Sequence, residues 1–432
     1  MFNCKSPNIY VPTLYFIEGL PNALVALSSA VLFQNLGCSI EFIGQATTVL
    51  TLPWMLKFAW APLVDMYGKK RQWILVAHTV LACIAFCLAL AVQPSSEKSP
   101  LWLIYWLASI MATMAIASAT QDIAMDGFYI ECLTKEQQSF FVGVRNAAYR
   151  MAMLFGQGFL VFLAGSLSHK FGIGTGWCVS FLIASLIFLS AFFLHRKILP
   201  LDSRTVESDL GTAVEGIKSV EKIRFTEVFS TFFDRPRLLP ILAFVLLFRL
   251  GDTLMLKMAT PFLLAKVGEG GLGISTETVG LIYGGVGVAL LFCGGIVGGY
   301  LVSKFGLKRT LLPAAVVQNT AIVLYYVMAV IKPGVLVVAI FNGFEQFAYG
   351  IGLSAYTVFL LSLASDRFRS GHYAIATALM ALGGLIPGYF SGSLCTQLGF
   401  EKYFLFSFCL SIPGMIAIPF LPIEPEREAS SA

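Results

Sequence analysis

Charged residues are what this sequence has little of. Of its 432 residues, 12% are Asp, Glu, Lys or Arg, while 57% are hydrophobic. A soluble domain of ordinary composition carries about 25% charged residues. Too few polar side chains remain to cover a water-facing surface, which excludes an ordinary soluble globular protein. The composition predicts a protein whose outer surface faces lipid.

Patterns for metal binding and disulfide bonding are lacking as well. The four histidines are dispersed, and the nine cysteines are scattered, mostly within apolar runs. Cys83 and Cys87 share a helix face, but they have no histidine or acidic cluster near them, so we interpret them as packing residues. We therefore expect no metal site and no disulfide framework.

Long apolar runs are what the sequence has instead. A run of about 18 or more apolar residues can span a bilayer as a helix. The first run, from Val11 to Phe33, is too long for the core of a signal peptide, so we expect an uncleaved first helix. The sequence predicts an all-α membrane protein with twelve transmembrane helices, near residues 11–34, 43–64, 72–92, 101–131, 139–164, 176–195, 238–265, 277–302, 309–330, 334–364, 371–395 and 402–422.

The basic residues of the loops predict the orientation. Cytoplasmic loops are enriched in Lys and Arg, and the net charge of +5 fits this bias better than it fits nucleic-acid binding. If the N-terminus is cytoplasmic, the opposite side carries one lysine per loop. We therefore predict two cytoplasmic termini and no nucleic-acid partner. The cytoplasmic side then holds Lys69, Lys70, Arg71, Lys135, Lys304, Lys308, Arg309, Arg367 and Arg369.

One central segment, 196–237, has mixed charge and contains no spanning run. It therefore separates an N-terminal half, 1–195, from a C-terminal half, 238–432, with six predicted helices in each. We interpret this segment as a solvated cytoplasmic linker rather than as a regulatory element.

A short pattern recurs four times along the chain. It consists of a small residue, a leucine two positions later and a glycine seven positions later, at the end of the second or fifth helix of a half. Four copies at matching positions predict nested three-helix repeats, the plan of a transporter whose halves rock around a central site. The copies begin at Ala61, Gly165, Gly299 and Gly392, and they end at Gly68, Gly172, Gly306 and Gly399.

The first copy is also the richest in charge. The run from Ala61 to Arg71 resembles the signature loop between helices two and three of the major facilitator superfamily, and the run from Gly299 to Arg309 resembles its second-half counterpart. In that family the acid and the basic residues form a cytoplasmic latch between helices. A reading in which the basic residues fix the topology is compatible with this. The resemblance implies the major facilitator fold, with two pseudo-symmetric six-helix halves and a cytoplasmic gate made of Asp65, Gly68, Lys69, Lys70, Arg71, Gly306, Lys308 and Arg309.

Charged residues also lie inside the predicted spans. A charge at mid-membrane costs about 2.5–3.5 kcal/mol on insertion scales, so such residues face a cavity or a charged partner. For each one alone, a structural ion pair between helices is an equally good interpretation. The set as a whole favours a central cavity, because most members fall on helices one, four, five, seven and ten. The residues are Glu18, Lys57, Asp122, Asp126, Arg145, Arg150, Arg249, Asp252, Lys257 and Glu345.

Spacing relates several of these charges to one another. Asp122 and Asp126 are four residues apart and therefore share one face of a helix. Two carboxylates so close repel each other, which favours uptake of a proton by one of them. Arg249 and Asp252 are three residues apart, which predicts an ion pair on helix seven.

A closer resemblance covers nearly the whole chain. It implies a proton-driven permease of the bacterial inner membrane that imports anhydro-muropeptides for cell-wall recycling, chiefly N-acetylglucosaminyl-anhydro-N-acetylmuramic acid with or without a peptide. It also implies a small-molecule substrate and no cofactor besides the coupling protons, and we expect a monomer in the lipid bilayer. The motifs that resemble the AmpG family are Gly19-Leu20-Pro21, the runs Lys57 to Asp65 and Ser118 to Asp126, Ala148-Tyr149-Arg150, Leu250-Gly251-Asp252 and Phe344-Glu345-Gln346.

Three residues depart from the pattern of that family. Glu18, Arg145 and Lys257 occupy positions where small or neutral residues are expected. Glu18 and Lys257 lie on pseudo-symmetric helices, so the two can face each other across the cavity. These departures leave open another small solute, such as a siderophore or an acetyl-CoA-like anion.

Two other classes of protein fit the sequence less well. A membrane-embedded enzyme, such as a lipid or glycosyl transferase, needs a catalytic cluster in a loop, and a sensor needs an added signalling domain. We therefore predict a transporter without enzymatic activity, in which carboxylates carry the proton and cationic or polar groups bind the substrate. The predicted proton-coupling residues are Asp122, Asp126, Asp252, Glu345 and Glu18, and the predicted substrate-binding residues are Lys57, Gln121, Arg145, Tyr149, Arg150, Arg249 and Lys257.

Overall fold

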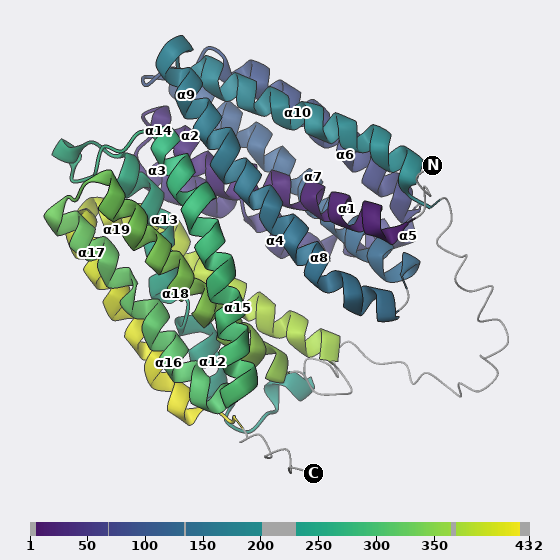
Figure 1. The fold of residues 1–432 in the computed structure, drawn as a ribbon, viewed down its shortest axis with the longest axis vertical. Helices are drawn as coiled ribbons and strands as arrows, with labels where there is room; N and C mark the ends of the chain where they lie inside the picture. The colour runs from purple at the N-terminus through teal and green to yellow at the C-terminus, as the bar shows by residue number, and fades with distance from the viewer. Residues whose placement is uncertain (1–5, 68, 134, 201–229, 364–368, 424–432) are drawn as a thin grey trace. The chain divides into compact units, whose positions relative to one another are not determined.

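The computed structural model describes residues 6–67, 69–133, 135–200, 230–363 and 369–423, and these ranges contain helices but no strand. The predicted all-α class is therefore confirmed. The contacts of the chain divide it into two compact units (Figure 1). Unit 1 comprises Met1–Ser39, Ala46–Val220 and Ser275–Gly284, and unit 2 comprises Ile40–Gln45, Glu221–Ile274 and Gly285–Ala432. The predicted boundaries at 195 and 238 stay a prediction, because residues 201–229 lie outside the described ranges.

Unit 1 is a bundle of long apolar helices. Within it, α6 packs against α7 and α10, while α1 packs against α7 and α8. Two π-helical turns, η1 and η3, continue one α-helix into the next, so that the first span runs unbroken from Pro7 to Asn35. Its elements are α1 (Pro7–Asn22), η1 (Ala23–Ser28), α2 (Ser29–Asn35), α4 (Leu52–Leu56), η2 (Lys57–Ala59), α5 (Ala61–Met66), α6 (Lys70–Val92), α7 (Leu101–Cys132), α8 (Lys135–Met153), η3 (Leu154–Leu160), α9 (Val161–Phe171), α10 (Ile173–Ile198) and α14 (Thr276–Leu281).

Unit 2 is built around an aromatic core. Phe248 of α12's C-terminal cap stacks on Tyr356 of α18 with ring centroids 4.8 Å apart, and Phe244 meets Phe359 at 4.9 Å. Rings in these arrangements add to the gain from burial. Its elements are α12 (Leu238–Leu247), α13 (Leu250–Leu264), η5 (Val267–Glu269), α15 (Val288–Phe305), α16 (Leu307–Thr320), α17 (Ile322–Ile331), α18 (Val335–Ser362), α19 (Arg369–Ala417) and η8 (Ile418–Phe420), while α3 (Ile40–Val49) and η6 (Ile282–Gly287) divide between the units.

The described ranges contain 10 continuous helices that are long and apolar enough to cross a membrane. The predicted count of twelve spans stays a prediction, and two features account for the lower number of continuous helices. One reason is that residues 40–66 form short pieces, and Pro53 lies in the first turn of one of them, α4. Proline is suited to a helix start and not to a helix interior. The other reason is that the last two predicted spans join into α19, which is kinked at Gly399.

The glycines that end the repeated pattern have a common backbone conformation. Gly172, Gly306 and Gly399 have φ of 88°, 76° and 74°, each with ψ near 155°. Side chains with a Cβ rarely adopt this conformation, so only glycine allows the sharp turn there at little cost. Each of these glycines therefore marks the end of one helix and the start of the next. The first copy ends at Gly68, which lies outside the described residues.

Candidate functional site

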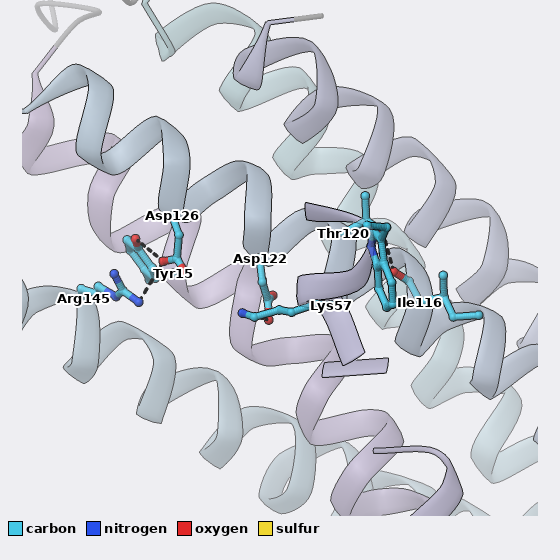
Figure 2. Close-up of polar contacts among 8 residues, drawn as sticks. Tyr15, Lys57, Ile116, Thr120, Asp122, Asp126 and Arg145 are labelled. Atoms are coloured by element: carbon cyan, nitrogen blue, oxygen red, sulfur yellow. Dashed lines mark hydrogen bonds and ion pairs between the residues drawn. The ribbon is translucent and has the colours of Figure 1, made fainter. Parts of the chain in front are cut away.

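The acidic pair of α7 forms the centre of a charged cluster in unit 1 (Figure 2). Arg145 of α8 places its Nη2 2.9 Å from Oδ1 of Asp126, and Lys57 of η2 places its Nζ 3.8 Å from Oδ2 of Asp122. Each carboxylate therefore has its own cation, supplied by a different helix. The two attractions offset the repulsion between carboxylates that are one helical turn apart.

Tyr15 of α1 completes the surroundings of Asp126. Its hydroxyl donates to Oδ1 of Asp126 at 3.3 Å, and the guanidinium carbon of Arg145 lies 4.3 Å from the centre of its ring. Arg145 also lies 5.6 Å from the ring centre of Tyr129. Cation–π contacts of this kind hold a guanidinium in place in addition to its ion pair. Sequence reasoning missed both tyrosines, although Tyr15 lies three residues before Glu18 and thus on the same helix face.

Glu18 brings a third carboxylate to the cluster. It is 7% exposed, and its Oε2 has no hydrogen-bond partner among the described residues. It interacts electrostatically with both acids of α7 and with Arg145 and Lys57. The cluster thus contains three carboxylates and two cations. A buried carboxylate without a compensating cation is costly, and one bound proton would balance the set.

The cluster has an accessible edge and a buried edge. The side chains of Lys57, Arg145 and Asp126 are 35%, 31% and 35% exposed, whereas that of Asp122 is 10% exposed. Oδ1 of Asp122 has no hydrogen-bond partner within the described ranges. A solute reaching this cluster therefore meets Arg145, Asp126 and Lys57 first.

The remaining predicted polar residues of unit 1 have other surroundings. Gln121 is fully buried and donates from Nε2 to the carbonyl of Ile17 at 3.3 Å, which ties α7 to α1. Tyr149 and Arg150 are half-buried on α8. In the part of the chain that the structure describes, no hydrogen bond or ion pair is found for Arg150. Gln121 therefore has the geometry of a tether between helices rather than of a group open to a substrate.

Next to the cluster, an aromatic side chain fixes the end of η2, the turn that carries Lys57. Trp60 donates from Nε1 to the Thr120 hydroxyl at 3.1 Å, and Thr120 donates to the carbonyl of Ile116 at 2.8 Å (Figure 2). This chain attaches the segment after Lys57 to α7. It holds the lysine beside Asp122 without an added charge.

Unit 2 contains a second, more buried cluster. Nη2 of Arg249 lies 3.1 Å from Oδ2 of Asp252 and donates to the hydroxyl of Tyr349 at 2.8 Å. The spacing predicted this pair, and the structure adds Tyr349 of α18 to it. Asp252 is 1% exposed. Nε of Arg249 has no hydrogen-bond partner among the described residues.

Glu345 is the second acid of this cluster. It is 2% exposed, interacts electrostatically with Asp252 and accepts a hydrogen bond from Nε2 of Gln346 at 2.8 Å. Lys257 lies half-buried on the same helix as Asp252. Because Lys257 belongs to unit 2 and Glu18 to unit 1, their predicted approach stays a prediction.

Two basic residues of the predicted gate contact backbone carbonyls within unit 1. Nζ of Lys70, a buried side chain, donates to the carbonyl of Val64 at 3.1 Å. Nη2 of Arg71 donates to the carbonyl of Arg196 at 2.6 Å, which joins the start of α6 to the end of α10. The two contacts join α6 to α5 and to α10, respectively.

The other predicted gate residues lie next to helix starts or outside the described residues. Lys69 precedes α6 and is exposed, and Lys308 and Arg309 are exposed just after the Gly306 turn. The side chain of Asp65 and all of Gly68 lie outside the described residues. The gate therefore stays a prediction. Within the described ranges, no group of three or more His, Cys, Asp or Glu residues is arranged to hold a metal ion.

Comparison with known proteins identifies the family of this chain. Residues 13–382 match the Major Facilitator Superfamily. The chain is 27% identical over 419 residues to an anhydromuropeptide permease of Escherichia coli strain K12, which covers 94% of this chain and 77% of the relative. It is 23% identical to the putative transporter AmpG 4 of Rickettsia conorii, with 94% of each chain covered.

Solved structures share the fold at low identity. The nucleoside transporter NupG has a TM-score of 0.69 at 13% identity and covers 95% of this chain and 97% of its own. A D-xylose–proton symporter has a TM-score of 0.67 at 16% identity, with 96% of this chain and 97% of its own covered. These likenesses bear on the fold and not on the solute carried.

Proposed function

This chain belongs to the Major Facilitator Superfamily and is a multi-pass membrane transporter, and from this premise we propose that it imports anhydro-muropeptides together with protons. The likeness to an anhydromuropeptide permease over 94% of the chain supports the solute. The loop lysines and arginines support two cytoplasmic termini in a bacterial inner membrane.

The observation that carries the proposal is the charge count of the unit 1 cluster. Glu18, Asp122 and Asp126 share two cations, Lys57 and Arg145, so one carboxylate is in excess. An excess carboxylate next to an accessible edge is a site for one exchangeable proton. A structural ion-pair network has no need of this excess, because buried charges that only hold helices together are best matched one to one.

Asp126 is the carboxylate that couples proton and solute in this proposal. It is the most exposed of the three acids, and it holds Arg145 through a 2.9 Å ion pair. A proton on Asp126 weakens that pair and leaves the guanidinium available to a carboxylate of the solute, which it binds through two parallel hydrogen bonds. Proton and solute then bind together. Each positive charge that moves inward gains about 2.3 kcal/mol per 100 mV of membrane potential.

Uptake into membrane vesicles tests the proposal. Vesicles that contain the protein receive labelled N-acetylglucosaminyl-anhydro-N-acetylmuramic acid, with and without an imposed proton gradient. We expect accumulation only with the gradient, and collapse of the gradient by a protonophore should release the label.

Two outcomes would contradict it. Uptake of an iron chelate or of an acyl-CoA in place of the disaccharide would replace the solute and leave the proton step standing. Accumulation that is insensitive to the gradient would remove the proton step, whatever the solute.

A further inference from the structure

An apolar groove in unit 1 is lined by none of the residues of the charged cluster. It has a volume of about 680 Å³ and is bounded by α1, α8 and α10. Its lining includes Phe16, Met151, Ile183 and Leu186, with Met151 and Leu186 about 60% exposed. All three helices belong to candidate membrane spans. The groove therefore faces the hydrocarbon of a bilayer, and its volume is in the range of about 300–1,000 Å³ of ligand pockets.

The α10 wall of the groove follows one helical stripe. The lining residues of α10 recur at intervals of three and four: Ile183, Leu186, Ile187, Ser190, Ala191, Leu194 and His195. Continuing this spacing past Leu194 leads to Lys197. The groove therefore points along α10 towards an exposed lysine.

Positive charge gathers at that end of the groove. Arg196 and Lys197 are both exposed in the last turn of α10, and Arg71 is held beside them by its bond to the carbonyl of Arg196. In the described part of the chain, neither Arg196 nor Lys197 forms an ion pair. Three cations at the polar end of a lipid-facing groove are complementary to an anionic headgroup.

We propose that this groove binds an anionic phospholipid, with an acyl chain along α10 and the phosphate at Lys197, Arg196 and Arg71. The apolar wall excludes a polar solute, and the cations select the headgroup. The site is independent of the proposed transport cargo. With the predicted orientation, the lipid comes from the cytoplasmic leaflet, where anionic headgroups attract basic residues.

Native mass spectrometry of the full chain tests this, with phosphatidylglycerol and phosphatidylcholine as probes. We expect preferential retention of phosphatidylglycerol by the wild type. Each neutralisation, Arg196→Gln or Lys197→Gln, should weaken its binding about fivefold, since each basic residue near an anionic surface contributes about 1 kcal/mol. Lys170→Gln, an exposed lysine at the end of α9, is the matched control and should have no effect.

A second pair of variants tests the groove itself. Ser190→Trp fills it and should remove the retained lipid, whereas Phe193→Trp changes an exposed residue of α10 outside the lining and should not. Equal retention of the two lipids by the wild type, or undiminished retention in Ser190→Trp, would overturn the proposal. So would a dimer that forms in place of lipid binding and is lost in Ser190→Trp.

Discussion

The charged clusters of the two units differ in how far each is closed to its surroundings. In unit 1, Asp126 and Arg145 are about one-third exposed, while in unit 2 Asp252 and Glu345 are 1% and 2% exposed. Both clusters hold acids that lie near other acids. In the proposed mechanism, the open cluster exchanges a proton and a solute at its exposed edge. The closed cluster matters for the stability of unit 2, because breaking an ion pair there leaves an unpaired charge in an apolar core.

The largest expected effect follows from breaking the closed cluster. Arg249→Met leaves Asp252 buried and unpaired, which should cost about 3–5 kcal/mol of stability. Arg145→Met removes the equivalent cation from the open cluster, where solvent screens the remaining charge, and should cost no more than about 1 kcal/mol. Thermal unfolding in detergent measures both. The double variant Arg249→Met/Asp252→Leu should recover most of the lost stability. Equal losses of stability for Arg249→Met and Arg145→Met would contradict the difference between the two clusters.

The next effect is on transport rather than on stability. Asp126→Asn keeps the shape of the side chain but cannot exchange a proton in the same way, so gradient-driven uptake should fall by about a hundredfold or more, the scale of a lost proton-transfer group. Thermal stability should change little. Glu131→Gln, an exposed acid on the same helix, is the matched control and should retain wild-type uptake. Full driven uptake by Asp126→Asn would show that this residue serves structure alone.

A smaller loss of stability is expected from substitutions in the glycine turns of the two units. Gly399→Ala in unit 2 and Gly172→Ala in unit 1 should each lose about 1–3 kcal/mol, because both glycines have a positive φ that strains any residue with a Cβ. Neither added Cβ would meet another atom within 4 Å, so the cost is one of backbone strain. Gly299→Ala, in a helix with equally open space, is the control and should be neutral or slightly stabilising. Equal melting temperatures for all three variants would contradict this account of the turns.

The smallest effect sharpens the description of the open cluster. Tyr15→Phe removes one hydrogen bond to Asp126 and leaves the aromatic ring next to Arg145. The loss of this bond should weaken the cluster by about 1 kcal/mol. The concentration of solute that gives half-maximal uptake should shift by about fivefold. Tyr10→Phe, five residues earlier on the same helix, should leave uptake unchanged. A loss as large as that of Asp126→Asn would mean that the Tyr15 hydroxyl itself moves the proton.

Much of the fold was predictable because the composition shows that the outer surface of the protein faces lipid. Scarce charge and long apolar runs require helices in lipid, since a backbone in hydrocarbon must satisfy its own hydrogen bonds. The repeated pattern predicted matching positions along the chain, and three of its four final glycines share a positive φ. The count of twelve spans stays a prediction, because the described ranges contain 10 continuous helices of sufficient length and apolarity. Apolar composition extends across the break at Pro53 and the kink at Gly399, whereas helical geometry does not.

The sequence by itself determined which residues carry charge inside the membrane and which of them share a helix face, because spacing along one helix is a local property. It predicted the Arg249–Asp252 pair for that reason. Only the tertiary structure decided that Arg145 pairs with Asp126, that Lys57 faces Asp122, and that Tyr15 joins them. Those contacts join different helices, and side-chain packing between helices has no period that a single sequence displays. The same holds for Gln121, which helix packing buried as a tether, and for the groove between α1, α8 and α10.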